Sequence, residues 1–136
     1  MQKVINMKYQ GKKVVGVWMD FQHAFIISTD NRTTGADYAM LKKIERDGHE
    51  DDNYKNERVE LSKDKSELKK YFKAIADEID QDHSIFIFGP GKAQEEFKNA
   101  LEDNQHFASK DIVLGTSDKI SVNQMVAKVK DHFEGN

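Results

Sequence analysis

The sequence predicts a single α/β domain built on a mixed five-stranded sheet with three helices. The first third of the chain holds short β-branched and aromatic runs separated by turns, which is typical of adjacent antiparallel strands. The second half alternates helical hydrophobic periodicity with two short apolar runs. A helix between successive strands requires parallel, right-handed crossovers. We therefore expect the strand order 3-2-1-4-5, with the first strand at the centre.

The three N-terminal strands are expected to form a meander. Residues 12–20 and 23–30 predict two antiparallel strands joined by a short turn. Beyond a second turn, hydrophobic residues separated by polar ones predict a third, half-exposed strand. These residues are Tyr38, Met40 and Ile44.

Residues 45–60 are almost free of apolar side chains and rich in acidic ones. We expect a long acidic loop here. Loops of this length inside a compact domain are uncommon, and they are usually functional or disordered. Both a functional loop and a plain solvated one therefore remain open.

The first helix follows this loop. Asp64 and Glu67 have the spacing of a capping box and predict its start. Six hydrophobic residues then lie at the spacing of one helical face. They are Leu68, Tyr71, Phe72, Ile75, Ala76 and Ile79. The uninterrupted apolar run in residues 84–89 predicts a strand covered on both faces.

Two more helices and one more strand complete the expected fold. Ala93, Phe97 and Leu101 predict the inner face of the second helix, and residues 111–115 predict another covered strand. A capping box at Ser121 and Gln124 predicts the start of the third helix. Its inner face comprises Val122, Met125, Val126, Val129 and Phe133.

The composition excludes several classes of function. The 136 residues include 21 basic and 24 acidic side chains, so no bulk attraction to nucleic acid or anionic membranes is expected. There is no cysteine, which excludes disulfides, thiolate catalysis and Cys-based zinc sites. No apolar run approaches the roughly 20 residues of a membrane span, and the N-terminus lacks the features of a signal peptide. We expect a cytoplasmic protein with a tail at residues 1–11 and one domain at residues 12–136.

The turn Gly89-Pro90-Gly91-Lys92 lies between a strand and a helix, as phosphate-binding loops do. Ala93 replaces the hydroxyl that a Walker-type loop needs, and Gln94 replaces the third glycine of the dinucleotide fingerprint. One interpretation is a tight turn that uses proline and unusual glycine backbone angles. The other is a generic anion or small-ligand site at the strand ends. That site would comprise Gly89, Gly91, Lys92, Thr116 and Ser117.

Asp20 ends the first strand and could be a metal ligand, as expected in ribonuclease-H-like nucleases with the same strand order. Such sites need several converging carboxylates, and the sequence places no second acid convincingly beside Asp20. Aspartate is also common in hairpin turns. A metal-dependent nuclease that uses Asp20 remains an alternative, and no other metal site or catalytic residue is predicted.

Several segments share their order and pattern with one known family. Residues 14–20 form a strand that returns at once through residues 23–28, and residues 111–129 give a closing strand and helix. Gly89-Pro90-Gly91-Lys92 followed by Phe97 matches a family pattern of a strand, a glycine-proline turn and a helix. Together these features resemble the central domain of archaeal and eukaryotic class-1 peptide-chain release factors and of Pelota. The resemblance covers nearly the whole chain and implies the same α/β fold.

The resemblance fails at the catalytic loop. In release factors the loop before the long helix contains Gly-Gly-Gln, which promotes peptidyl-tRNA hydrolysis. Residues 45–60 contain only Gly48 and no glutamine, and their acidic charge should be repelled by the phosphate-lined interior of a ribosome. The resemblance therefore implies a stand-alone bacterial relative without the hydrolytic motif, comparable to Pelota.

We accordingly expect a non-catalytic, translation-associated binding protein whose partner is the ribosome or a translation factor. We expect no cofactor, no membrane association and no strong binding of free nucleic acid, and the oligomeric state is left open. The nuclease using Asp20 and the anion or small-ligand binder are the alternatives.

Overall fold

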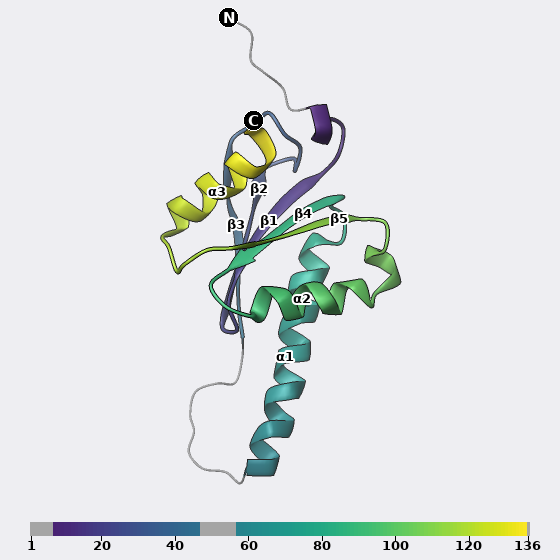
Figure 1. Cartoon of the computed structure of the whole chain (residues 1–136), viewed down its shortest axis with the longest axis vertical. Coiled ribbons are helices and arrows are strands. Elements are labelled where there is room, and N and C mark those ends of the chain that lie inside the picture. The colour runs from purple at the N-terminus through teal and green to yellow at the C-terminus, as the bar shows by residue number, and fades with distance from the viewer. Residues whose placement is uncertain (1–6, 47–56, 136) are drawn as a thin grey trace, which may run out of the picture.

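The computed structural model describes residues 7–46 and 57–135. Five strands form one mixed sheet in the order β3-β2-β1-β4-β5, and three helices pack on it (Figure 1). The α/β class, the strand order and the three helices are therefore confirmed. The strands are β1 Val14–Met19, β2 His23–Thr29, β3 Tyr38–Glu45, β4 Ser84–Gly89 and β5 Asp111–Thr116. The helices are α1 Glu57–Ile79, α2 Ala93–Glu102 and α3 Val122–Glu134, with short 3-10 turns η1 Met7–Tyr9 and η2 Gln105–Phe107.

The central strand β1 pairs with β2 in antiparallel orientation and with β4 in parallel orientation. Strand β5 extends the sheet parallel to β4. The carboxyl ends of the parallel strands β1, β4 and β5 therefore lie together at one end of the sheet, and their amino ends lie together at the opposite end. The Gly-Pro-Gly turn lies at the first of these ends, because it directly follows β4.

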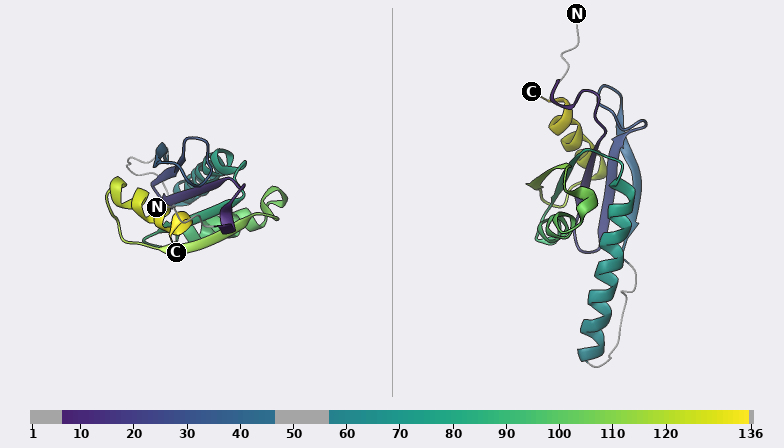
Figure 2. Two further views of the ribbon diagram at one scale, coloured as in Figure 1. Left: turned by 90° about the horizontal axis from the view of Figure 1, so that it is seen from above. Right: turned by 90° about the vertical axis from the view of Figure 1, so that its right-hand side faces the viewer.

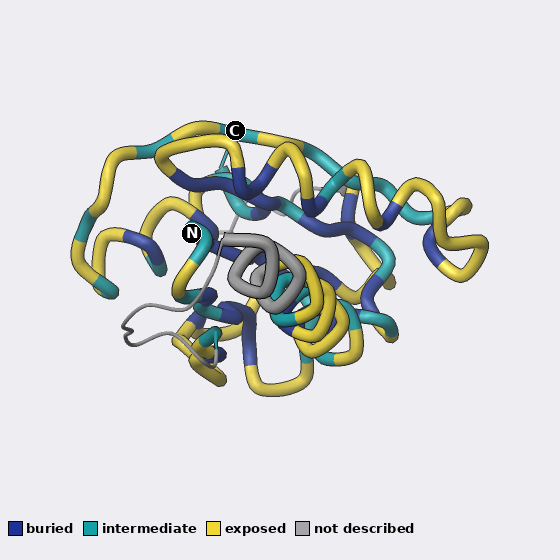
Figure 3. The backbone as a smooth tube through the Cα atoms, turned by 90° about the horizontal axis from the view of Figure 1, so that it is seen from below, coloured by how far each residue is buried: buried dark blue, intermediate teal, exposed yellow. Residues whose placement is uncertain are grey.

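Each face of the sheet has its own core, as the alternation of side chains along a strand requires. Val15, Val17 and Met19 of β1 face the cluster that α1 and α2 complete. Val14 and Trp18 face the cluster that α3 completes. Buried residues accordingly concentrate in the strands, whereas the outer sides of the helices are exposed (Figure 3).

Strand β3 does not follow the simple alternation that the sequence suggested. Its pairing with β2 shifts at a bulge between Ile26 and Ile27, where Leu41 is the extra residue. Tyr38 therefore packs on the α3 side and Ile44 on the α1 side. The predicted half-exposed strand is confirmed, but Met40 is exposed and only Tyr38 and Ile44 of the three apolar residues are buried.

Strand β5 is an edge strand and is only partly covered. None of its residues is fully buried, and Leu114 is 38% exposed. The expectation of a strand covered on both faces was wrong, because β5 lies at the edge of the sheet, where it is less covered, and a hydrophobic run does not show a strand's position in the sheet. Strand β4, which has β1 and β5 as neighbours, is nearly completely buried as expected.

Helix α1 begins at Glu57, seven residues before the predicted capping box at Asp64. Asp64 therefore lies within the helix, and the predicted start was wrong. The helix projects well beyond the end of the sheet before its C-terminal half packs on it (Figures 1 and 2). The predicted inner face is confirmed, since its six residues are buried or packed against the core. The central part of the expected 45–60 loop, residues 47–56, lies outside the described residues.

Helix α3 starts as predicted. The Ser121 hydroxyl accepts a hydrogen bond from the Gln124 backbone N–H at 3.1 Å, and the Gln124 side chain accepts one from the Ser121 N–H at 2.9 Å. Met125, Val129 and Phe133 are buried beneath the helix. Tyr9, from the expected N-terminal tail, is buried with its ring edge-on to Phe133. Within the described residues, no helix combines the length and hydrophobicity needed to cross a membrane.

The contact between β1 and α3 leaves no room for a side chain at Gly16. A Cβ atom built on Gly16 would lie 2.3 Å from Cγ2 of Val129. The absence of a side chain at this position therefore sets the depth at which α3 sits on the sheet.

We predict that Gly16→Ala lowers the free energy of unfolding by about 1–3 kcal/mol, because the added methyl overpacks the contact with Val129. Combining it with Val129→Ala should recover part of this loss, with a coupling energy of about 0.5–3 kcal/mol. Urea unfolding of the single and double variants measures both quantities.

The matched control combines Gly16→Ala with Val122→Ala, which shortens a half-buried valine at the start of the same helix. This pair should be additive. An additive result for Gly16 and Val129 as well would contradict the close-contact explanation.

Candidate functional site

The Gly-Pro-Gly turn is shaped by a close approach of two backbones. A Cβ atom on Gly89 would lie 2.0 Å from the carbonyl oxygen of Met19, at the end of the neighbouring strand β1. Among the described glycines, positive φ angles occur at Gly11 and Gly35 and not at Gly89 or Gly91. The expectation that these glycines supply unusual backbone angles was therefore wrong. Gly89 is required instead because any side chain there would collide with the Met19 carbonyl.

The space behind the turn is filled by Gln94, whose side chain is completely buried. Its Nε2 donates hydrogen bonds to the carbonyls of Gly89, at 2.7 Å, and Gly115, at 3.4 Å. The Ser117 backbone N–H also donates to the Gly89 carbonyl, at 2.9 Å. Gln94 thus joins the ends of β4 and β5. Sequence analysis missed this role, although a glutamine next to the inward-facing Ala93 was a signal.

The predicted anion site is only partly assembled. Thr116 and Ser117 line a polar hollow of about 410 Å³ together with Pro90, Asp118, Ile120 and Lys128. Gly91 and Lys92 do not line this hollow. Lys128, which the sequence did not single out, supplies a cation there, and Asp118 supplies an opposing carboxylate. The hollow therefore lacks the net positive charge expected of an anion site.

Asp20 closes the β1–β2 hairpin. Its Oδ1 accepts hydrogen bonds from the backbone N–H groups of Gln22 and His23, both at 2.8 Å. The Tyr71 hydroxyl donates to the Asp20 carbonyl at 2.9 Å. Among the side chains that the structure describes, in residues 8–46 and 65–135, no three His, Cys, Asp or Glu gather into a possible metal site. The turn-forming role of Asp20 is thus the one with observed contacts.

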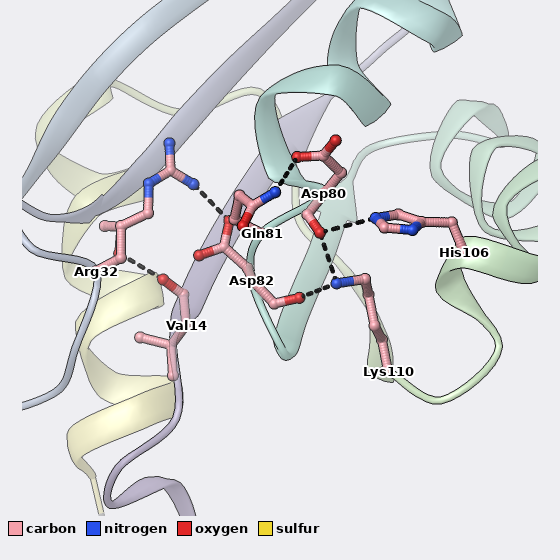
Figure 4. A network of polar contacts seen from close by, with 8 residues as sticks. Val14, Arg32, Asp80, Gln81, Asp82, His106 and Lys110 are labelled. Carbon is pink, nitrogen blue, oxygen red and sulfur yellow. Dashed lines mark hydrogen bonds and ion pairs between the residues drawn. The ribbon is translucent and has the colours of Figure 1, made fainter.

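A buried ion pair lies at the amino ends of the parallel strands (Figure 4). Asp82 is fully buried just before β4, and Arg32, from the turn after β2, donates from Nη1 to its Oδ2. Arg32 has a left-handed backbone with φ of 62°, and its carbonyl accepts a hydrogen bond from the Val14 N–H at 2.7 Å. These contacts hold the strained Arg32 in place at the amino ends of the parallel strands.

Lys110 and His106 extend the network to the end of α1. Lys110 Nζ donates to the carbonyls of Asp80, at 2.8 Å, and Asp82, at 2.6 Å, while His106 Nε2 lies 3.2 Å from the Asp80 carbonyl (Figure 4). A cation at these carbonyls satisfies acceptors that the helix end leaves free. These contacts satisfy the carbonyl and Oδ2 of Asp82, whereas its Oδ1 is buried with no hydrogen-bond partner among the described residues.

An open surface with a different character lies between α1 and α2. Its floor contains the buried Phe97, Leu101 and Phe107, and Phe72 and Ala76 of α1 form one wall. The resulting groove has a volume of about 530 Å³. Unlike the turn and the ion pair, the groove leaves Phe72 and Ala76 only half-buried among the described residues.

Comparisons with known proteins give matches at the level of structure. No protein-family model matches the chain, and no curated protein matches it by sequence. The archaeal translation termination factor aRF1 matches with a TM-score of 0.58 at 18% identity, over 90% of this chain and 34% of that one. Pelota of Archaeoglobus fulgidus matches with a TM-score of 0.55 at 11% identity, over 90% and 36%.

A third similar structure is Dom34 of S. cerevisiae, a translation termination-like factor involved in RNA quality control pathways and interacting with Hbs1. It matches with a TM-score of 0.50 at 14% identity, over 93% of this chain and 38% of that one. This chain therefore spans about a third of the length of each similar protein. At these identities the matches establish a shared fold, which is the fold that the resemblance implied.

We predict that the stability of the protein depends on pH through Asp82. Burial raises the pKa of Asp82 from its usual 3.8 to about 6, although Arg32, Lys110 and Lys13 act in the opposite direction. Asp82 therefore binds its proton more tightly in the folded protein than in the unfolded chain, so its contribution to stability is greatest below pH 4 and is lost as pH rises through 6. Relative to Asp82→Asn, the wild type should lose up to about 3 kcal/mol across this range.

Urea unfolding of both proteins at successive pH values provides the measurement. The difference in unfolding free energy should change between pH 4 and 6 and level off above. A difference that stays constant throughout would show that Asp82 does not titrate in this way.

Proposed function

We propose that this chain is a translation-associated binding protein that acts without catalysis by docking on the ribosome or on a translation factor. The observation that supports it best is the structural match over 90% of the chain to an archaeal translation termination factor and to Pelota. The order of elements adds to this support, since β3 leads into a long helix and a Gly-Pro-Gly turn leads into α2, as in the family that the sequence resembles.

Two features favour docking over hydrolysis. Residues 45–60 contain no Gly-Gly-Gln and no glutamine at all, so the group that the family uses for peptidyl-tRNA hydrolysis has no counterpart there. The glycine turn is filled by Gln94 and by the backbone of β1. The remaining surfaces suit contact with a macromolecule better than chemistry on a small substrate.

Neither alternative function gains a comparable observation. A nuclease would need further carboxylates beside Asp20, whose Oδ1 already accepts two backbone hydrogen bonds. An anion binder would need Lys92 to face Thr116 and Ser117, whereas Asp118 occupies that hollow and Lys92 does not line it. We therefore retain one proposed function.

Co-sedimentation tests this function. We predict that the purified chain sediments with ribosomes, or with ribosomes carrying a bound translation factor, and that it releases no peptide from peptidyl-tRNA above background. An unrelated acidic protein of similar size is the control for nonspecific sedimentation. The proposal fails if the chain stays at the top of the gradient in every translation state, including starvation, or if it releases peptide as a release factor does.

A further inference from the structure

The groove between α1 and α2 is longer than its deepest part. A second hollow of about 570 Å³ continues it toward the N-terminal part of α1, and the two hollows share Lys69 and Phe72. Its residues extend from Lys65 to Asp80. At about 1.5 Å per residue this path is about 22 Å long, or roughly four helical turns.

The floor of the groove is apolar along its length. Phe97 and Leu101 come from α2, Phe107 follows it, and Leu68 and Phe72 come from α1. Phe72 and Phe97 lie with their ring centroids 5.2 Å apart, and Phe72 is only partly buried. Phe97, Leu101 and Phe107 are at most 3% exposed, so the apolar contacts open to a partner come from the half-buried Leu68, Phe72 and Ala76. Amphipathic helices bind in grooves through contacts of this kind.

The rim of the groove has opposite charges at its two ends. Lys65 and Lys69 are exposed at one end, and neither forms a hydrogen bond or ion pair within the part of the chain that the structure describes. Asp77 and Asp80 lie at the other end. Lys73, between them, already pairs with Asp77 at 3.0 Å. The two unpaired lysines therefore leave one end positive.

We propose that this groove binds a short amphipathic helix of a partner protein, with its apolar face on Phe72 and Ala76 and acidic side chains at Lys65 and Lys69. The half-buried apolar side chains of α1 contribute most of the affinity, and the charges fix the direction of the bound helix. This proposal does not depend on a role in translation, because it uses only the surface of α1 and α2.

A pair of designed peptides tests the proposal. Each is a fluorescein-labelled helix of about four turns with leucine and phenylalanine on one face, and one carries glutamates at one end where the other carries lysines. Fluorescence anisotropy with the full chain should show that the glutamate peptide binds about tenfold or more tightly than the lysine peptide. The preference should weaken as the ionic strength rises, because the charges are exposed.

Charge reversal gives the sharpest comparison. Lys65→Glu combined with Lys69→Glu should invert the preference, so that the lysine peptide binds better. The control, Lys119→Glu with Lys130→Glu, makes the same change in net charge at exposed positions outside the groove. This control should leave the preference for the glutamate peptide unchanged.

A second pair of variants tests the apolar part. Ala100 is exposed and lines the groove, and Ala127 is exposed on α3. Ala100→Glu should weaken binding of the glutamate peptide by about tenfold or more, and Ala127→Glu should leave this binding unchanged. Both positions are on helix surfaces, so both variants should keep the fold.

Three outcomes would overturn the proposal. They are no binding of either peptide up to about 1 mM, equal binding of the two peptides, and binding that Ala100→Glu leaves unchanged. Analytical ultracentrifugation of the same proteins tests whether a second copy of this chain occupies the groove. If the wild type is a dimer that Ala100→Glu converts to a monomer, the groove holds a second copy of this chain and the proposal is wrong.

Discussion

The lack of free space around β1 is the constraint on which the rest of the structure depends. All six residues of this strand are buried. On one face Val129 of α3 packs directly on Gly16, and at the end of the strand the Met19 carbonyl fills the place where Gly89 would have a side chain. The position of α3 and the shape of the Gly-Pro-Gly turn thus follow from contacts with one strand. A turn shaped in this way serves the packing of the fold, and Gly89 is needed whether or not a ligand binds.

Periodicity and capping were enough to predict most of the fold, because hydrophobic spacing records which side of an element is buried. They failed where the outcome depended on other elements. The bulge at Leu41 reverses the faces of β3, and a run such as residues 111–115 is the same in an edge strand and in a central one. The capping residues at Asp64 gave a false start because they also fit inside a longer helix.

The candidate sites were harder to predict than the fold, since they depend on residues brought together from distant segments. The sequence marked Lys92 as the cation of the strand-end site, whereas the structure puts Lys128 in that hollow. Gln94 of α2 is hydrogen-bonded to Gly115 of β5, and Arg32 is paired with Asp82, fifty residues away. These polar contacts stabilise the amino and carboxyl ends of the parallel strands. The α1–α2 groove differs from them, because Phe72 is only half-buried and Lys65 and Lys69 are exposed with no ion pair to any described side chain.

Photo-crosslinking in living cells would test most directly whether this protein works by docking through the α1–α2 groove. A photoreactive phenylalanine analogue would be placed at Lys69 in the groove, at Lys92 in the glycine turn and at Lys130 on α3, and the adducts identified by mass spectrometry. The account predicts that Lys69 alone gives a strong adduct, and that this adduct contains a ribosomal protein or a translation factor. Equal adducts from all three positions, or a dominant adduct from Lys92, would contradict it.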